Sequence, residues 1–204
     1  MIKALARKLT EFMISQESII EDESEIYQYG VEITLSSILN ITLIMLISII
    51  TGRIISGAVF LGTFIIMRRY CGGYHARSYL MCNIIFAATF IAVLIFSEYV
   101  TIHMKADVLL MMLSILPVFI FAPVPNENKP LTVEERTRYS RWSLAIYVPL
   151  CLTQCICSVL VPYISRVLFY SLMAVSLLIM VEVVLQMTGI HKGADPLLPD
   201  DRVL

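Results

Sequence analysis

The apolar positions of this chain gather into long stretches, which predict helices that cross a membrane. A helix needs about 20 mainly apolar residues to span a hydrocarbon core about 30 Å thick. Stretches near that length occur at residues 33–50, 54–67, 83–100, 108–122, 143–162 and 167–187. The pattern predicts an all-α, polytopic integral membrane protein with six transmembrane helices, in a single membrane domain over residues 1–204.

The polar segments at the two ends of the chain differ from these spans. Within residues 1–22, apolar positions recur at helical spacing with basic ones opposite, which predicts an amphipathic helix. The apolar side holds Ile2, Leu5, Leu9, Phe12 and Met13, and the basic side holds Lys3, Arg7 and Lys8. Such a helix fits the membrane interface, and it fits equally well against the cytoplasmic face of the protein itself. Residues 188–204 form a polar tail.

The second span is short, and a charged stretch follows it. Residues 54–67 give roughly 21 Å of helix, which is less than the bilayer core. The next fifteen residues, Arg68–Cys82, contain three arginines and a double glycine. An arginine at the bilayer midplane costs roughly 2.5–3.5 kcal/mol, so this stretch is not a lipid-facing span. We expect a re-entrant or broken-helix segment that enters the membrane edge buried in protein.

The basic residues divide unevenly between the two sides that six spans create. With the N-terminus in the cytoplasm, only Arg53, Lys105 and Arg166 of the 15 Lys and Arg residues lie outside. Cytoplasmic loops of membrane proteins carry such an excess of Lys and Arg. The bias predicts a multi-pass protein of the cell membrane, with both termini and the Arg68–Cys82 stretch at the cytoplasmic face.

Composition excludes several other classes of protein. The chain is 58% apolar and 15% charged, whereas soluble domains are about 25% charged. The net charge of −1 gives no indication of nucleic acid, and we expect no such partner. The five cysteines form no framework for disulfide bonds. Cys151, Cys155 and Cys157 suit small apolar positions better than a zinc site, so we expect no metal and no cofactor.

His75 and Cys82 are the strongest candidates for chemistry. A thiol becomes an effective nucleophile when an imidazole within hydrogen-bond reach takes its proton. Arg68, Arg69 and Arg77 could supply a positive environment that favours the thiolate. A histidine and a cysteine alone are weak evidence, because buried cysteines are common in apolar proteins. The glycines and clustered arginines strengthen the catalytic interpretation.

Helix geometry restricts how this pair can work together. In one unbroken helix, residues 75 and 82 are separated by about 10.5 Å of rise, which is too far for a hydrogen bond. The helix must therefore break between them, or His75 must lie on a loop that Gly72 and Gly73 permit. Ser78 is a suitable N-cap for a helix that holds Cys82 in its first turn or just beyond. The positive end of that helix would favour the thiolate.

Glu182 is a carboxylate inside the predicted sixth span. A charged residue in a membrane span is a functional hypothesis by default, with a partner to be named. One interpretation pairs Glu182 with Arg68 or Arg69, because their depths match. The other places its carboxylate at the interface, where it reaches water.

The Arg68–Cys82 stretch resembles the signature of the accessory gene regulator protein B (AgrB) family, whose members are membrane cysteine endopeptidases. The shared pattern is Arg-Arg-x-x-Gly-Gly-x-His-Ala-x-Ser-x-x-x-Cys over residues 68–82. Ala122-Pro123 and Lys129-Pro130 are similar to a loop of that family. The resemblance implies that His75 and Cys82 are the catalytic pair. It also implies that Arg68 and Gly73 are required for function.

The family resemblance implies a substrate and a reaction. The substrate would be the propeptide of a quorum-sensing autoinducer in a bacterial cell membrane. Cys82 would cleave off its C-terminal part and form a thioester, which a residue of the peptide attacks to close a thiolactone or lactone ring. A homodimer within the lipid bilayer is compatible with this function. The alternatives are a transporter or export channel for the peptide, or a non-catalytic membrane partner in the same signalling system.

Overall fold

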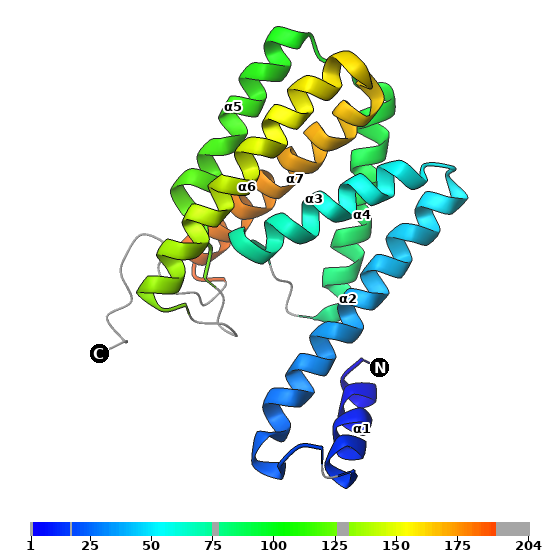
Figure 1. The fold of residues 1–204 in the computed structure, drawn as a ribbon, viewed down its shortest axis with the longest axis vertical. Helices are drawn as coiled ribbons and strands as arrows, with labels where there is room; N and C mark the ends of the chain where they lie inside the picture. The colour runs from blue at the N-terminus through cyan, green and yellow to red at the C-terminus, as the bar shows by residue number, and fades with distance from the viewer. Residues whose placement is uncertain (1, 17, 75–77, 126–130, 191–204) are drawn as a thin grey trace.

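The computed structural model describes residues 2–16, 18–74, 78–125 and 131–190, and these ranges contain seven α-helices and no strand (Figure 1). The elements are α1 (Ile2–Ser15), the 3₁₀ helix η1 (Glu21–Glu23), α2 (Ser24–Ile50), α3 (Ile54–Cys71), α4 (Tyr79–Tyr99), α5 (Met104–Phe121), α6 (Val133–Leu160) and α7 (Pro162–Met187). The all-α prediction is confirmed. Most of the predicted polar tail, residues 191–204, lies outside the described residues.

Several of these helices are long and apolar enough to cross a membrane. Among the described residues, five segments qualify: Glu21–Ile50, which contains α2, and the helices α3, α4, α6 and α7. The apolar part of α5, Ala106–Phe121, is shorter and contains Pro117. The polytopic prediction is confirmed, and the count of six spans is approximate because the apolar part of α5, Ala106–Phe121, is shorter than the five segments above.

Helix α3 covers the short second span and continues into the arginine stretch. It has 18 residues, which correspond to about 27 Å of helix. Arg68 and Arg69 lie in its last turn, where cations interact favourably with the negative end of the helix dipole. The first residues of the motif therefore supply the length that residues 54–67 lack.

Helix α7 is the central helix of the bundle. It packs against α3, α4, α5 and α6, and Figure 1 shows it surrounded by them. Its buried positions include the large residues Leu172 and Ile179 and the small residues Ser171 and Ser176. Small residues let helix backbones approach closely in a membrane bundle, where packing drives association. The C-terminal part of α7 is thereby brought beside the end of α3, where Ile179 lies close to Gly73.

The N-terminal helix forms a hairpin with α2 that projects from the bundle (Figure 1). Ala6 and Thr10 of α1 are buried, and α1 packs along α2. On the other side of α1, Leu5 and Phe12 are exposed. The amphipathic prediction is confirmed. The helix packs on α2 through Ala6 and Thr10, and its apolar side stays exposed, where it is suited to a lipid interface.

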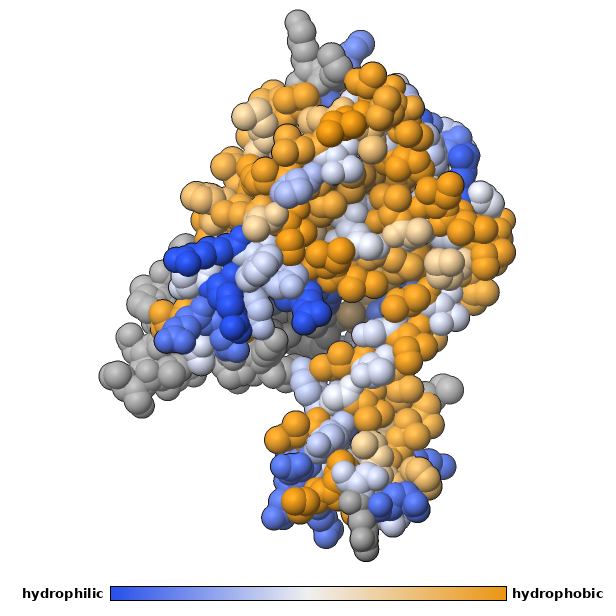
Figure 2. All heavy atoms as spheres, viewed as in Figure 1, coloured by the Kyte–Doolittle hydropathy of each residue, from blue (hydrophilic) through white to orange (hydrophobic). Residues whose placement is uncertain are grey.

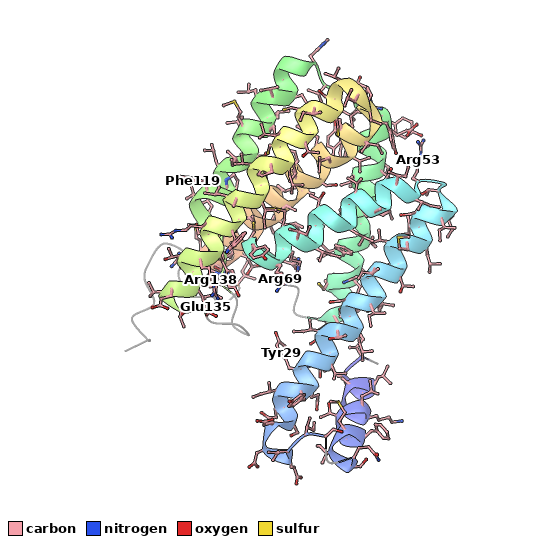
Figure 3. The ribbon with its side chains drawn as sticks, in the orientation of Figure 1. Tyr29, Arg53, Arg69, Phe119, Glu135 and Arg138 are labelled. Carbon is pink, nitrogen blue, oxygen red and sulfur yellow. The ribbon has the colours of Figure 1, made fainter. Side chains whose placement is uncertain are left out.

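Figure 2 shows a surface that is apolar over most of the bundle, with hydrophilic residues gathered mainly at its edges. Arg53, at the start of α3, forms an ion pair with Glu98 at 2.7 Å. Figure 3 shows Arg53 at one end of α3 and Arg69 at the other, with Arg138 of α6 near the latter end. The bundle thus has two polar ends, which the apolar surface separates.

Candidate active site

The chain leaves helical conformation directly after Cys71, at the double glycine. Gly72 has φ +69° and Gly73 has φ +114°, and glycine adopts such values without a steric penalty. A Cβ atom on Gly72 would lie 2.5 Å from the carbonyl oxygen of Val124. The next helix, α4, begins at Tyr79. The predicted helix break is confirmed, and residues 75–77, including His75, lie outside the described residues.

Ser78 caps the helix that carries Cys82. Its backbone is extended, with φ −135° and ψ 146°, and its side-chain oxygen accepts a hydrogen bond from the Met81 N–H at 3.3 Å. The Cys82 N–H donates to the Ser78 carbonyl at 3.0 Å, which closes the first helical turn. The predicted N-cap is confirmed. Cys82 therefore lies in the first turn of α4, at the positive end of the helix dipole.

Cys82 lies on the wall of a cavity of about 690 Å³ between α2, α3 and α4. Motif residues in its lining are Arg68, Arg69, Gly72, Tyr74 and Cys82. Much of the remaining lining is apolar and includes Ile33, Ile41, Phe64 and Phe86. Cys82 is half-buried, and it is a free thiol. The described part of the arginine motif therefore lines one largely apolar cavity, and the Cys82 thiol lies in the wall of that cavity.

Arg68 ties the non-helical segment to α3. Its Nη2 donates to the carbonyl oxygen of Tyr74 at 2.9 Å, and its guanidinium lies 5.9 Å from the ring centre of Phe64. Its charge also interacts with Cys82 and with Glu182. A membrane arginine is typically paired with carbonyls or carboxylates in this way. Arg68 thus fixes the segment that leads to His75 and brings positive charge to the Cys82 thiol.

Arg69 and Gly73 have different surroundings from Arg68. Arg69 is exposed and lines the cavity, with its guanidinium 5.9 Å from the ring centre of Tyr70. In Figure 3, Arg69 on α3 and Tyr29 on α2 come from the two helices that flank the cavity. Gly73 is buried, and Ile179 of α7 lies close to it.

Glu182 is buried in α7, with 5% of its surface exposed. Its Oε1 accepts a hydrogen bond from the Gln186 side-chain amide at 3.0 Å, and it interacts electrostatically with Arg68. The structure therefore places the carboxylate inside the protein near Arg68. The alternative position, with the carboxylate reaching water at the interface, is not adopted.

The segment after α5 covers the end of α3. The Val124 N–H donates to the Cys71 carbonyl at 2.9 Å, and the Gln186 side-chain amide donates to the Pro125 carbonyl at 3.0 Å. Pro123 and Val124 line the cavity. These contacts connect α3 and α7 through the segment from Pro123 to Pro125, beside the double glycine.

Comparison with known proteins identifies the family. The sequence model of the family described as Accessory gene regulator B matches residues 6–190. This chain belongs to that family. It is similar to an AgrB-like protein of Clostridium perfringens strain SM101, with 28% identity over 154 residues and 72% of each chain covered. A protein of Listeria monocytogenes serotype 4a, also named as AgrB-like, is 28% identical over 142 residues, which cover 66% of this chain and 67% of the relative.

The comparison with solved structures gives no significant match. Membership of the AgrB family supports a part in the processing of accessory gene regulator quorum-sensing peptides, in a membrane setting. The family and the helical architecture agree, since both describe a multi-pass membrane protein.

Sequence reasoning missed two residues beside the site of this AgrB-family protein. Glu32 of α2 is 6% exposed, and its Oε2 accepts a hydrogen bond from the Tyr79 hydroxyl at 2.8 Å. The predicted first span starts at residue 33, so Glu32 fell just outside it. A carboxylate at the end of a span is exposed to water and gives no reason to expect a functional role. Its position within a helix that begins at Ser24 would have marked it as a buried charge.

The described residues of this AgrB-family chain contain no group of three or more His, Cys, Asp or Glu side chains that could hold a metal ion. Cys71 is buried in the core near the end of α3, and Cys155 is exposed on α6. His75 lies outside the described residues, so the expectation of no metal stays a prediction.

Proposed function

We propose that this chain is a membrane-embedded cysteine endopeptidase that processes the propeptide of a quorum-sensing autoinducer. Cys82 is the nucleophile and His75 is its base. The observation that carries the proposal is the position of Cys82: in the first turn of α4, on the wall of an apolar cavity, with the charge of Arg68 acting on it. Each of these features favours a thiolate in a sheltered site.

In the first step, the Cys82 thiolate attacks the propeptide carbonyl at the C-terminal side of the future signal. His75 takes the thiol proton and returns it to the leaving amine as the C–N bond breaks, which leaves a thioester on Cys82. Arg68 supports this step in two ways. Its hydrogen bond to Tyr74 holds the segment before His75, and its positive charge stabilises negative charge on sulfur or on the carbonyl oxygen.

In the second step, a cysteine or serine of the bound peptide attacks the thioester, closes a thiolactone or lactone ring and releases Cys82. Water competes for the same carbonyl, so the step requires a dry site. The cavity of about 690 Å³ has the size of an ordinary ligand pocket. Its apolar wall supports ring closure over hydrolysis.

The site belongs at the cytoplasmic face in this proposal, with both termini on the same side. The end of the bundle that holds Arg68 and Arg69 also holds Arg138, and an excess of cations marks a cytoplasmic side. Arg69 and Gly73 support the site from the cavity wall and from the loop. The proposed function is compatible with a homodimer and does not require one.

Co-expression with the cognate propeptide tests the proposal. We expect full-length propeptide to accumulate with Cys82→Ala and with His75→Ala, because each removes one member of the catalytic pair. Cys155→Ala is the matched control, since Cys155 is exposed on α6 and outside the cavity lining, and it should process normally. A transporter or a non-catalytic partner predicts normal cleavage in the Cys82 variant, so that result contradicts the proposal.

A further inference from the structure

We propose that Glu32 is a positioning residue that orients Cys82 through Tyr79, an inference that rests on the proposed function of Cys82. The Tyr79 hydroxyl donates to Glu32 Oε2 at 2.8 Å. Tyr79 is the first residue of α4, three positions before Cys82. Residues three apart on a helix lie on neighbouring positions of one face. A hydrogen bond that holds Tyr79 therefore also sets the direction of the Cys82 side chain.

A second hydrogen bond between the same two helices lies one turn further on. The Ser36 hydroxyl donates to Asn83 Oδ1 at 3.1 Å. Glu32 and Ser36 are four residues apart on α2, and Tyr79 and Asn83 are four apart on α4. The two bonds bracket Cys82 in the sequence, and Glu32, Ser36 and Asn83 are all buried. Together they fix the rotation of the first turn of α4 against α2.

Helix α2, which is hydrogen-bonded to α4, also forms one wall of the cavity. Tyr29, Ile33, Ser37 and Ile41 of α2 line the cavity. Ile33 and Ser37 directly follow Glu32 and Ser36, the two residues of α2 that bond to α4. Tyr29 points from α2 toward the region of Arg69 (Figure 3). A rotation of α4 relative to α2 would carry the Cys82 thiol away from this wall, where the peptide would bind.

The chemistry of Glu32 suits an orienting role better than a role in bulk packing. Burial of a carboxylate is unfavourable unless its oxygens accept hydrogen bonds, and both do. The Gln28 side-chain amide donates to Oε1 at 3.1 Å, and Tyr79 donates to Oε2. Hydrogen bonds to a charged acceptor are shorter and stronger than neutral ones. The hydrogen bond from Tyr79 matters at the start of α4, because the first turn of a helix lacks the intrahelical hydrogen bonds that hold its interior.

Steady-state cleavage of a synthetic propeptide by the purified, detergent-solubilised full chain tests the inference. Tyr79→Phe removes one oxygen, and Tyr99→Phe is its matched control, because Tyr99 ends the same helix and is 80% exposed. We expect Tyr79→Phe to lower kcat about ten-fold with KM nearly unchanged. This change in kcat corresponds to a loss of about 1.4 kcal/mol of transition-state stabilisation. We expect Tyr99→Phe to match the wild type in both constants.

A graded series at position 32 separates orientation from folding. Glu32→Gln keeps a neutral acceptor, so we expect a kcat between those of the wild type and Glu32→Ala. The double variant of Glu32→Ala with Tyr79→Phe should be no slower than Glu32→Ala alone, because both changes remove the same bond. Thr34→Val is the control on α2, since Thr34 is exposed and bonds only to the backbone of its own helix. If the Glu32 variants do not fold, Tyr79→Phe decides alone.

The outcomes distinguish this inference from the proposed function. Wild-type kcat in Tyr79→Phe overturns the positioning role, provided that Cys82→Ala is inactive. Cleavage by Cys82→Ala instead contradicts the proposed function itself. A fall in thermal stability with unchanged kcat in the remaining folded protein would assign the Glu32–Tyr79 bond to folding alone, and it would also overturn the inference.

Discussion

Arg68 and Arg69 are neighbours in the sequence but differ in what they contact. Arg68 bonds to the Tyr74 carbonyl and interacts with Cys82 and Glu182. Arg69 is exposed on the cavity wall beside the ring of Tyr70. Consecutive residues on a helix point in directions about 100° apart, so the two side chains make different contacts although both line the cavity. The two arginines therefore provide a matched pair for an experiment.

We expect Arg68→Gln to abolish processing and Arg69→Gln to reduce it by only a few-fold. The first change removes the hydrogen bond that holds Tyr74 and leaves Glu182 without the charge that acts on it. The measurement is the fraction of propeptide cleaved on co-expression, with both proteins at equal levels. Equal loss in the two variants, or a larger loss in Arg69→Gln, would contradict the assignment.

At the scale of elements, local patterns predicted the positions of the helices, while the hydrogen bonds between α2 and α4 could not be predicted. The N-cap Ser78 and the break after Cys71 follow from rules that act within a few residues. The bond between Glu32 and Tyr79 spans 47 residues of sequence, and no local pattern specifies it. Helix α2 begins at Ser24, before the predicted span at residue 33. The Glu32 carboxylate can lie inside this helix because it accepts the hydrogen bond from Tyr79.

The start of α6 follows from the local sequence, although it lies before the predicted span at residue 143. Thr132 with acidic residues just after it is typical of a helix N-terminus, and α6 begins at Val133. Thr132 and Glu135 form a capping box, in which the Thr132 hydroxyl accepts from the Glu135 N–H at 3.2 Å. Apolar content marks where a helix lies in the membrane, and the cap marks where it starts. The polar first turns of α6 are helical without being part of the span.

Helix α7 binds the segment after α5 through the Gln186 side-chain amide, which donates both to the Pro125 carbonyl and to Glu182. We expect Glu182→Gln to abolish processing at a normal expression level, because the cation of Arg68 then loses a buried anion. The matched control is Glu98→Gln, which removes a half-exposed ion pair with Arg53 at the opposite end of the bundle and should process normally. Unchanged processing in Glu182→Gln would discard the pairing with Arg68.

The whole molecule has two polar ends that differ in their cations, and this difference predicts its orientation in the membrane. One end holds the last turn of α3 with Arg68 and Arg69. At the other end, the connection from α4 to α5 is fixed by Arg166, which donates to the Ser97 carbonyl at 2.7 Å. Tyr170 donates to the Val100 carbonyl beside it at 3.2 Å. The positive-inside rule puts the first end in the cytoplasm.

A thiol-labelling experiment in intact cells tests that orientation. In a chain whose five cysteines are replaced by alanine, Thr101→Cys lies in the connection from α4 to α5, and Thr188→Cys lies at the end of α7. Both positions are exposed, so access to each depends on the side of the membrane. We expect a membrane-impermeant maleimide to label Thr101→Cys in intact cells, and to label Thr188→Cys only after the cells are permeabilised. Labelling of Thr188→Cys in intact cells would put the cavity on the outer side of the membrane. A newly made propeptide does not arrive there, so the proposed function would lack a substrate.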